Sequence, residues 1–400
     1  MPSARIFDVA VIGLGAVGSA SLYQFARRGH RVLGLDRWNP PHDLGSSHGS
    51  TRITLCAVGE GDGYVPLVKR SHQIWREIEA DSGEDLLTQC GALIIAAAGN
   101  APTVHGKQDF FRRTVEVARR TGVPHELLDA AEARRQFPQF RLTGDEMAFH
   151  EPGGGYVRPE RCVAAQLGLA RRFGAQMRPN TQVTQLAHSG AGVRITTAGG
   201  EWFEAAKVVL AAGAWSPKLA GPALGPLTTP TRQVLHWFEP RDPAFFSPQV
   251  CPVYIWMHGN GAEDGFYGFP LVPGDHGVKV ATEQYRVTLS DADTLIRRVS
   301  DIEADSMFGR HVKARIPGLL PGATHSSACL YTMTPDAEFL VSPLPDNDRV
   351  LLVSACSGHG FKYSAALGEA VADLVGGIKD AGTLSHFSTD RPCLALAGAK

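Results

Sequence analysis

The stretch that decides the fold is Phe7-Asp8-Val9-Ala10-Val11-Ile12-Gly13-Leu14-Gly15-Ala16-Val17-Gly18, close to the start of the chain. Its apolar run predicts a buried strand, and the glycine pattern predicts a tight turn into a helix that continues through Ser19 to Arg28. A second strand is expected over Arg31 to Asp36, which completes a βαβ unit of about 30 residues. A strand, a glycine-rich turn, a helix and a terminal acid in this order predict a site for a dinucleotide, either FAD or NAD.

The residue types in this unit match the chemistry of such a ligand. Gly13, Gly15 and Gly18 let the backbone turn tightly and let a pyrophosphate reach the amides at the helix N-terminus, where the helix dipole favours negative charge. Asp36 is expected to accept hydrogen bonds from the adenosine ribose. A later buried strand, Lys207 to Leu210, ends in Ala211-Ala212-Gly213-Ala214-Trp215. These small residues permit a close backbone passage of the kind seen in two-domain flavoproteins, although an ordinary strand and turn would read the same way.

The rest of the chain alternates between two kinds of sequence pattern. Aromatic-rich strand candidates such as Val253 to Met257 and Gly265 to Phe269 indicate an antiparallel sheet, whereas Arg158 to Phe173 and Ser364 to Val375 read as helices of the first domain. We therefore predict an α/β (α+β) two-domain fold of the glutathione-reductase and D-amino-acid-oxidase type. The Rossmann-like dinucleotide domain is assigned residues 1–90, 151–220 and 325–400, and an antiparallel-sheet substrate domain is assigned residues 91–150 and 221–324.

Composition excludes several classes of function. The chain has 400 residues, 44% of them apolar, and 39 basic against 40 acidic side chains, so no long-range field gathers nucleic acid or anionic lipid. Seven cysteines without CxxC spacing predict neither a disulfide framework nor a metal site, and fit a reducing cytosol. No apolar run reaches the roughly 18 residues that a membrane span needs. We expect a cytoplasmic protein that binds small molecules.

Three further segments carry a family resemblance. They are Gly45-Ser46-Ser47-His48-Gly49-Ser50-Thr51-Arg52, then Ala328-Cys329-Leu330-Tyr331-Thr332-Met333-Thr334-Pro335-Asp336, and then Ser357-Gly358-His359-Gly360-Phe361-Lys362. Together, in this order, they resemble the monomeric sarcosine oxidase family, which includes N-methyltryptophan oxidase and pipecolate oxidase. The resemblance covers nearly the whole chain and implies an FAD enzyme that is monomeric.

The resemblance also implies roles for single residues. Cys329 corresponds to the cysteine joined through sulfur to the 8α-methyl of FAD, and Lys362 to the lysine that grips the substrate carboxylate. His48 and Arg52 correspond to residues near the flavin ring. Lys279 corresponds to the lysine implicated in oxygen activation, where a cation stabilises superoxide. These three, His48, Arg52 and Lys279, are the expected catalytic residues.

The full set of expected cofactor contacts combines the motif with the resemblance. The turn from Ser357 precedes a helix, so its amides are expected to stabilise the anionic reduced flavin, and His359 either orients flavin or substrate or is simply bonded within the structure. The expected cofactor-binding residues are Gly13, Gly15, Ala16, Val17, Gly18, Asp36, Arg37, Ser46, Ser47, Thr51, Val183, Ala212, Gly213, Trp215, Cys329, Gly358, His359, Gly360, Phe361 and Lys362.

Two departures from the family pattern leave the substrate open. Leu55 stands where sarcosine oxidases have an arginine that helps to bind carboxylate, and Glu283 stands where the family has a histidine. As in fructosyl-amino-acid oxidases, such an acid holds a cationic amine or accepts hydrogen bonds from a hydroxyl group. The expected substrate contacts are Lys362, Glu283, Leu55, Tyr267 and Tyr331. Tyr254, Trp256 and Phe269 either extend this aromatic wall or pack in the core.

The predicted function is oxidation of the C–N bond of a small amino acid or N-alkyl amino acid, with oxygen as the electron acceptor and hydrogen peroxide as a product. Three alternatives stay open at this point. One is a fructosyl-amino-acid (Amadori) or cyclic imino acid oxidase. Another is a flavin dehydrogenase that uses a carrier protein or quinone. The third is a nicotinamide-binding or ligand-sensing protein without redox turnover.

Overall fold

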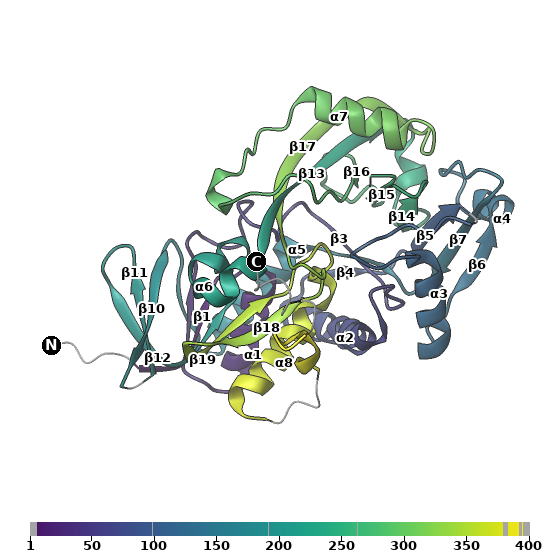
Figure 1. Ribbon diagram of the computed structural model, residues 1–400. Coiled ribbons are helices and arrows are strands. Elements are labelled where there is room, and N and C mark those ends of the chain that lie inside the picture. The colour runs from purple at the N-terminus through teal and green to yellow at the C-terminus, as the bar shows by residue number, and fades with distance from the viewer. Residues whose placement is uncertain are drawn as a thin grey trace.

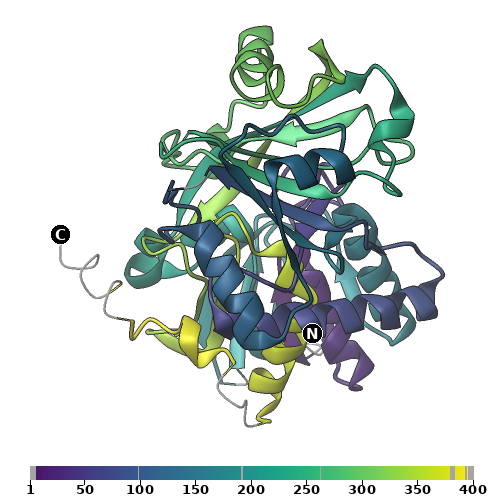
Figure 2. The same cartoon turned by 90° about the vertical axis from the view of Figure 1, so that its right-hand side faces the viewer.

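Two large sheets make up the protein, as a computed structural model shows for residues 6–97, 99–190, 192–261, 263–378, 383–391 and 394. In both views the parallel strands with α1 and α8 lie on one side, and the long strands β13 and β17 with α7 lie on the other (Figures 1 and 2). The two-domain architecture predicted from the glycine turn and the aromatic strands is therefore present.

The first sheet contains the βαβ unit. In spatial order its strands are β10 (Val183–Ser189), β11 (Gly192–Thr197), β12 (Trp202–Leu210), β1 (Ile6–Ile12), β2 (Val32–Leu35) and β9 (Gln176–Arg178), with β19 (Asn347–Ser354) beside β12 and β18 (Leu340–Leu344) beside β19. β1 pairs in parallel with β2 and β12, and β19 pairs in parallel with β12. The carboxyl ends of these strands therefore share one edge of the sheet, which is where ligands bind in such folds.

Helices cover the sheet and explain its continuous apolar strands. The helices of this domain are α1 (Ala16–Arg27), α2 (Val65–Ser82), α5 (Pro159–Arg172), α6 (Gly221–Leu224) and α8 (Ser364–Gly376). α1 packs against α5 and α8. A Cβ atom on Gly368 would lie 2.4 Å from the Cβ atom of Ala20, so glycine is what lets α8 approach α1 so closely. Strands enclosed in this way are buried on both faces and read as unbroken apolar runs.

The second sheet runs β17-β13-β16-β15-β14-β5-β7-β6. Its strands are β5 (Ala92–Ala97), β6 (Glu126–Asp129), β7 (Glu146–Glu151), β13 (Thr229–Pro240), β14 (Val253–Met257), β15 (Gly265–Gly268), β16 (Val278–Ala281) and β17 (Leu319–Met333). All neighbours are antiparallel except β14 and β5. Helices α3 (Phe110–Thr121), α4 (Ala130–Gln136) and α7 (Asp301–Met307) accompany it.

A small three-stranded sheet links the two bodies. It consists of β3 (Arg52–Thr54), β8 (Gly155–Val157) and β4 (Leu87–Thr88). β3 follows directly on the Gly45–Thr51 loop, so its pairing with β8 fixes the start of the segment that carries Arg52 and Leu55.

The observed elements refine the expected ones. β14 has the predicted bounds, whereas the β10–β11 hairpin was not predicted, because its outer residues are polar and exposed and give only a weak alternation. The expected return to the first domain at residue 325 falls inside β17, which stays paired with β13 as far as Met333. Among the described residues, no helix is both long and apolar enough to cross a membrane.

Candidate active site

The glycine turn has the geometry that its pattern predicts. Gly13 adopts a φ of +85°, and a Cβ atom there would lie 2.5 Å from the carbonyl oxygen of Ala211, at the end of β12. A Cβ atom on Gly18 would lie 1.8 Å from the carbonyl oxygen of Gly13. Gly15 occupies the N-cap of α1 and provides no side-chain cap, and the Ser47 hydroxyl accepts a hydrogen bond from the amide of Ala16 at 3.1 Å. The dipole of α1 still favours an anion at this helix N-terminus.

Asp36 is fixed at the end of β2 by two backbone amides. Its carboxylate accepts hydrogen bonds from the amide of Leu14 at 2.7 Å and from that of Trp38 at 2.9 Å. The aromatic rings of Trp38 and Trp215 meet edge to face, with centroids 4.7 Å apart. Asp36 and this aromatic pair form one end of a long cavity.

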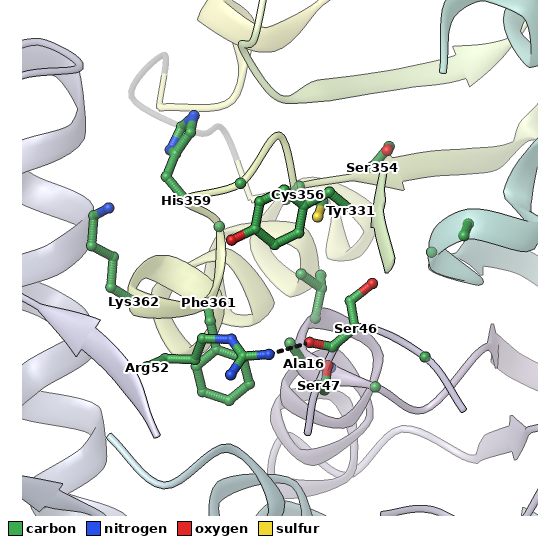
Figure 3. A pocket seen from close by; sticks show the side chains of 18 of the residues that line it. Ala16, Ser46, Ser47, Arg52, Tyr331, Ser354, Cys356, His359, Phe361 and Lys362 are labelled. Carbon is green, nitrogen blue, oxygen red and sulfur yellow. Dashed lines mark hydrogen bonds between the residues drawn. The ribbon is translucent and has the colours of Figure 1, made fainter. Parts of the chain in front are cut away.

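The cavity is lined by residues from the glycine turn to the second sheet. Figure 3 shows part of this lining. The cavity brings together most of the residues predicted from the sequence. Those that line it are Gly13, Gly15, Ala16, Val17, Asp36, Arg37, Ser46, Ser47, Arg52, Leu55, Val183, Ala212, Gly213, Trp215, Tyr267, Glu283, Tyr331, Gly358, His359, Gly360, Phe361 and Lys362. The remaining predicted residues, Gly18, His48, Thr51, Lys279 and Cys329, lie behind its wall.

The turn before α8 presents backbone to the cavity. Gly358 has a φ of +86°, and a Cβ atom on Gly360 would lie 1.8 Å from the carbonyl oxygen of Ala355. The amide of Ser357 donates to the carbonyl oxygen of Thr332 at 3.0 Å, which ties the turn to β17. Because Gly358 and Gly360 carry no side chains, a planar group can approach the amides of the turn closely.

The loop before β3 is held by charged side chains. Arg52 donates to the carbonyl oxygen of Thr51 at 2.8 Å. It also donates to the carbonyl oxygen of Ser46 at 2.7 Å, the bond drawn in Figure 3. Lys279, on β16, donates to the carbonyl oxygens of Gly49 at 2.6 Å and Thr51 at 2.7 Å. Arg52 therefore lines the cavity with its guanidinium group fixed, and Lys279 lies one layer behind it.

Burial shifts the pKa values of Lys279 and His48, which lie behind the cavity wall. Burial, followed by the charge of Arg52, lowers the pKa of Lys279 well below its usual range. The Lys279 ammonium nitrogen lies 4.1 Å from the ring centroid of Phe269, a contact that favours its charged form. Burial, and again Arg52, lowers the pKa of His48 to about 4, so this histidine is neutral at pH 7.

Cys329 is buried beside the same cations. It lies two residues before Tyr331 on β17, so both side chains point to the face of the strand that Tyr331 presents to the cavity. Burial raises the pKa of the Cys329 thiol, and the charges of Arg52 and Lys279 act in the opposite direction. A thiolate at this position would be stabilised by two cations, as a nucleophilic cysteine requires.

A buried network of charges closes the other end of the cavity. Lys362 donates to Glu60 at 2.9 Å, and His105 contacts the same carboxylate oxygen at 3.2 Å and Glu283 at 3.0 Å. Tyr285 donates to the second oxygen of Glu283 at 2.7 Å. The two carboxylates are thus matched by two cations within the wall of the cavity.

The pKa shifts in this network follow from burial and pairing. Burial alone would lower the pKa of His105, but Glu283 and Glu60 outweigh it and raise the pKa to about 9. Burial opposes ionisation of Glu60, yet Lys362 and His105 hold its pKa well below the usual range. Burial lowers the pKa of His359 to about 3. At pH 7 His105 is therefore a cation and His359 is neutral.

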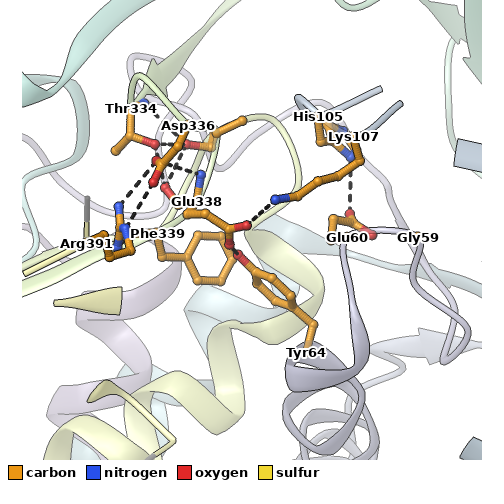
Figure 4. A network of polar contacts seen from close by, with 12 residues as sticks. Gly59, Glu60, Tyr64, His105, Lys107, Thr334, Asp336, Glu338, Phe339 and Arg391 are labelled. Carbon is orange, nitrogen blue, oxygen red and sulfur yellow. Dashed lines mark hydrogen bonds and ion pairs between the residues drawn. The ribbon is translucent and has the colours of Figure 1, made fainter. Parts of the chain in front are cut away.

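A second ion pair holds the segment that carries His105. Lys107 pairs with Glu338, whose carboxylate also accepts a hydrogen bond from Tyr64 (Figure 4). Pro102, Thr103 and Val104 of the same segment line the cavity. The segment therefore covers the polar end of the cavity and is anchored at two points.

Fewer of the expected aromatic side chains line the cavity than the sequence analysis allowed. Tyr267, Phe269 and Tyr331 line the cavity, and the hydroxyl groups of Tyr267 and Tyr331 lie 3.5 Å apart. Tyr254 and Trp256 face the opposite side of β14 and pack in a separate core with Phe140 and Phe266. Because side chains alternate along a strand, Ile255 and Met257 face the cavity in their place.

Sequence reasoning missed several residues of the site. Glu60 and His105 carry the polar network, and Glu160 accepts hydrogen bonds from the amides of Gly49 at 2.6 Å and Ser50 at 3.1 Å. Glu60 stands between two glycines, Gly59 and Gly61, a weak signal of a functional turn. Glu160 stands in the first turn of a helix, where an acid is ordinary.

The cavity has features that fit FAD. One end offers the N-terminus of α1, whose N-cap is a glycine, and the carboxylate of Asp36, which suit a pyrophosphate and a ribose. The middle offers the amides of the turn at Gly358 and the guanidinium group of Arg52, which suit a ring that becomes anionic on reduction. A dinucleotide domain whose site is closed by a second, antiparallel sheet defines a two-domain flavoprotein.

Comparison with known proteins identifies the family. Residues 8–374 match the family described as FAD dependent oxidoreductase, and the chain belongs to this family. It is 39% identical over 371 residues to the monomeric sarcosine oxidase of Streptomyces avermitilis, covering 92% of this chain and 93% of the relative. It is 33% identical over 375 residues to the N-methyl-L-tryptophan oxidase of Salmonella arizonae, covering 92% and 94%.

A solved structure with the same fold is that of NikD, an unusual amino acid oxidase essential for nikkomycin biosynthesis. The TM-score is 0.81 at 25% identity, over 96% of this chain and 97% of NikD. The predicted fold class, the predicted family and the prediction of an FAD-dependent oxidoreductase are confirmed. A nicotinamide-binding or purely ligand-sensing protein is no longer an alternative.

Proposed function

We propose that the protein oxidises the C–N bond of a small amino acid or N-alkyl amino acid and passes the electrons to oxygen. The observation that carries this proposal is the continuous cavity, which joins a dinucleotide site to a buried polar end that contains Lys362. Two relatives above 30% identity, a sarcosine oxidase and an N-methyl-L-tryptophan oxidase, support the choice of an N-alkyl amino acid.

Several residues of the chain have distinct roles in the proposed reaction. Lys362 has further N–H groups beyond the one given to Glu60, and they bind the substrate carboxylate. Tyr267, Phe269 and Tyr331 exclude water and orient the amine. When bound, FAD supplies the two-electron acceptor for the C–H bond next to nitrogen. Lys279 provides positive charge for the superoxide that forms when oxygen takes up its first electron.

We also propose that Cys329 forms the covalent link to FAD. The support is its position beside Arg52 and Lys279, on the strand face that leads to the cavity. The test is an absorption spectrum before and after acid precipitation. Yellow colour should stay with the wild-type pellet and leave that of Cys329→Ala. Colour that stays with the pellet of Cys329→Ala would place the link at another residue.

The oxygen role of Lys279 has a separate test. Stopped-flow mixing of the reduced enzyme with oxygen should show slow reoxidation in Lys279→Met, whereas anaerobic reduction by substrate stays near the wild-type rate. Lys313→Met, which changes an exposed lysine, is the control. Fast reoxidation in Lys279→Met would remove the residue from the oxygen reaction. Slow peroxide formation by the wild-type enzyme, despite fast anaerobic reduction, would instead support a dehydrogenase with another acceptor.

Glu283 restricts the range of candidate substrates. Burial opposes its ionisation, but His105 lowers its pKa, so a carboxylate lines the cavity where a sarcosine oxidase has a histidine. This favours amino acids that carry a hydroxyl group or a second amine, including fructosyl amino acids, as the second candidate. A peroxide assay with N-methyl, cyclic imino and fructosyl amino acids separates these classes.

The pH dependence follows from the chemistry of the amine. A protonated nitrogen has no lone pair to release, so turnover should rise with pH. A flat profile between about pH 6 and 10 would contradict this mechanism. We further propose that the enzyme is a cytoplasmic monomer, which cell fractionation and gel filtration test directly.

A further inference from the structure

One peptide unit lies between two opposite charges behind the cavity wall. The carbonyl group of the Gly49–Ser50 peptide accepts a hydrogen bond from the Lys279 ammonium at 2.6 Å. The N–H group of the same peptide donates to the Glu160 carboxylate at 3.1 Å. Glu160 also accepts from the amide of Gly49 at 2.6 Å. The peptide dipole thus has its negative end on the cation and its positive end on the anion.

This arrangement couples the two side chains although they do not touch. In a trans peptide the N–H and C=O groups point in opposite directions, so Lys279 and Glu160 lie on opposite sides of the loop. Hydrogen bonds in such a chain polarise one another, and bonds to ionised groups are the stronger ones. The negative charge of Glu160 therefore strengthens the bond that the Gly49 carbonyl accepts from Lys279.

Lys279 needs this support because its surroundings disfavour its charge. It is buried, and Arg52 brings a second positive charge close to it. The charged or titratable groups that face it are Arg52 from β3, Asp275 from the loop before β16, Glu160 from α5 and Cys329 from β17. Asp275 and Glu160 are both partly exposed, and both raise the pKa of Lys279, Asp275 the more strongly. Asp275 accepts a hydrogen bond from the Ser50 side chain and is not bonded to the Gly49–Ser50 peptide. Glu160 is the carboxylate joined to Lys279 through the peptide.

We propose that Glu160 is a positioning residue that keeps Lys279 protonated through the Gly49–Ser50 peptide and so sustains the oxygen reaction. Glu160 does not line the cavity, so it acts through Lys279 and the loop rather than on substrate or cofactor. The inference rests on the proposed role of Lys279 with oxygen.

The variant Glu160→Gln separates charge from shape. Its amide oxygen still accepts from the amides of Gly49 and Ser50, but the negative charge is gone. The holoenzyme should then react with oxygen at least tenfold more slowly at pH 8, and the upper limb of its pH profile should move down by about one pH unit. Anaerobic reduction by substrate should stay near the wild-type rate. In a Lys279→Met background, Glu160→Gln should cause no further loss.

A readout without turnover checks the same point. NMR of the oxidised holoenzyme labelled at the ε carbon of lysine follows the titration of Lys279, whose signal is assigned by its loss in Lys279→Met. The midpoint should fall in Glu160→Gln. The matched control is Glu79→Gln, because Glu79 also accepts from two consecutive amides, those of Leu86 and Leu87 at 2.9 Å, but outside the site.

The outcomes distinguish the inference from the role it rests on. If Lys279→Met reacts with oxygen at the wild-type rate, the proposed role of Lys279 fails, and that of Glu160 fails with it. If Lys279→Met is slow but Glu160→Gln keeps the wild-type oxygen rate and Lys279 midpoint, only the inference fails. If Glu160→Gln slows both half-reactions equally and leaves the midpoint unchanged, Glu160 holds the loop and nothing more.

Discussion

His105 allows a quantitative prediction about stability and pH. Its imidazolium group is buried between Glu283 and Glu60, which raise its pKa from the usual 6.5 to about 9 in the folded protein. A difference of this size between the folded and unfolded states corresponds to about 3 kcal/mol of stability. Because the folded pKa is the higher one, this contribution is complete below about pH 6.5 and is lost as the pH rises through 9.

The assay is urea unfolding of the wild type and of His105→Gln between pH 6 and pH 10. The difference in unfolding free energy between the two proteins should shrink by about 3 kcal/mol from pH 6 to pH 10. The control is His150→Gln, because His150 contacts Glu126 at 3.2 Å, but the Glu126 side chain is 55% exposed and water screens the pair. A His105→Gln difference that stays constant over this pH range would refute the reasoning.

Three further predictions concern other parts of the structure. Gly18→Ala places a Cβ atom 1.8 Å from the carbonyl oxygen of Gly13, so the purified protein should lack FAD, as its absorption spectrum will show. Glu151→Ala leaves the buried amide of Ala57 and the partly buried amide of Cys56 without their acceptor, and urea unfolding should register a loss of about 2–5 kcal/mol, in contrast to a smaller loss for Glu151→Gln. Asp293→Asn weakens the contact to Arg37 across the domains, so FAD should dissociate faster in a Cys329→Ala background, and high salt should reduce the difference from the parent.

The fold could be predicted largely from local sequence patterns. The first strand and the Gly13 turn form a contiguous signal whose physical requirements, burial and a positive φ, leave few alternatives. The sequence alone does not show that β17 ends at Met333, because a buried strand that contains Cys329 and Tyr331 would look the same in either domain. Pairing with β13 settles the point, and pairing between distant segments is invisible in one sequence.

The residues of the candidate site differ in the same way, because some could be predicted from local sequence and others could not. Residues within short motifs, such as Arg52 and Lys362, were found because neighbouring residues mark them. Glu60 and His105 lie far from each other and from Glu283 in the chain and meet it only through the tertiary fold, and each of the two looks like a surface residue when read alone. Buried charges that compensate one another leave no compositional trace, since the net charge of the chain stays near zero.

The dinucleotide domain is assembled from separate parts of the chain, and this sets the order of events during synthesis. β1 leaves the ribosome first, its neighbour β12 follows some two hundred residues later, and β19 pairs only when residue 350 has been made. The turn before α8, which closes the middle of the cavity, is made later still. β1 can pair with β2 early, but its other edge stays unpaired until β12 has been made, and an unpaired strand edge is prone to association with other chains. The turn before α8 is therefore the last part of the cavity wall to be made, so a cofactor cannot be fully enclosed before that turn has left the ribosome.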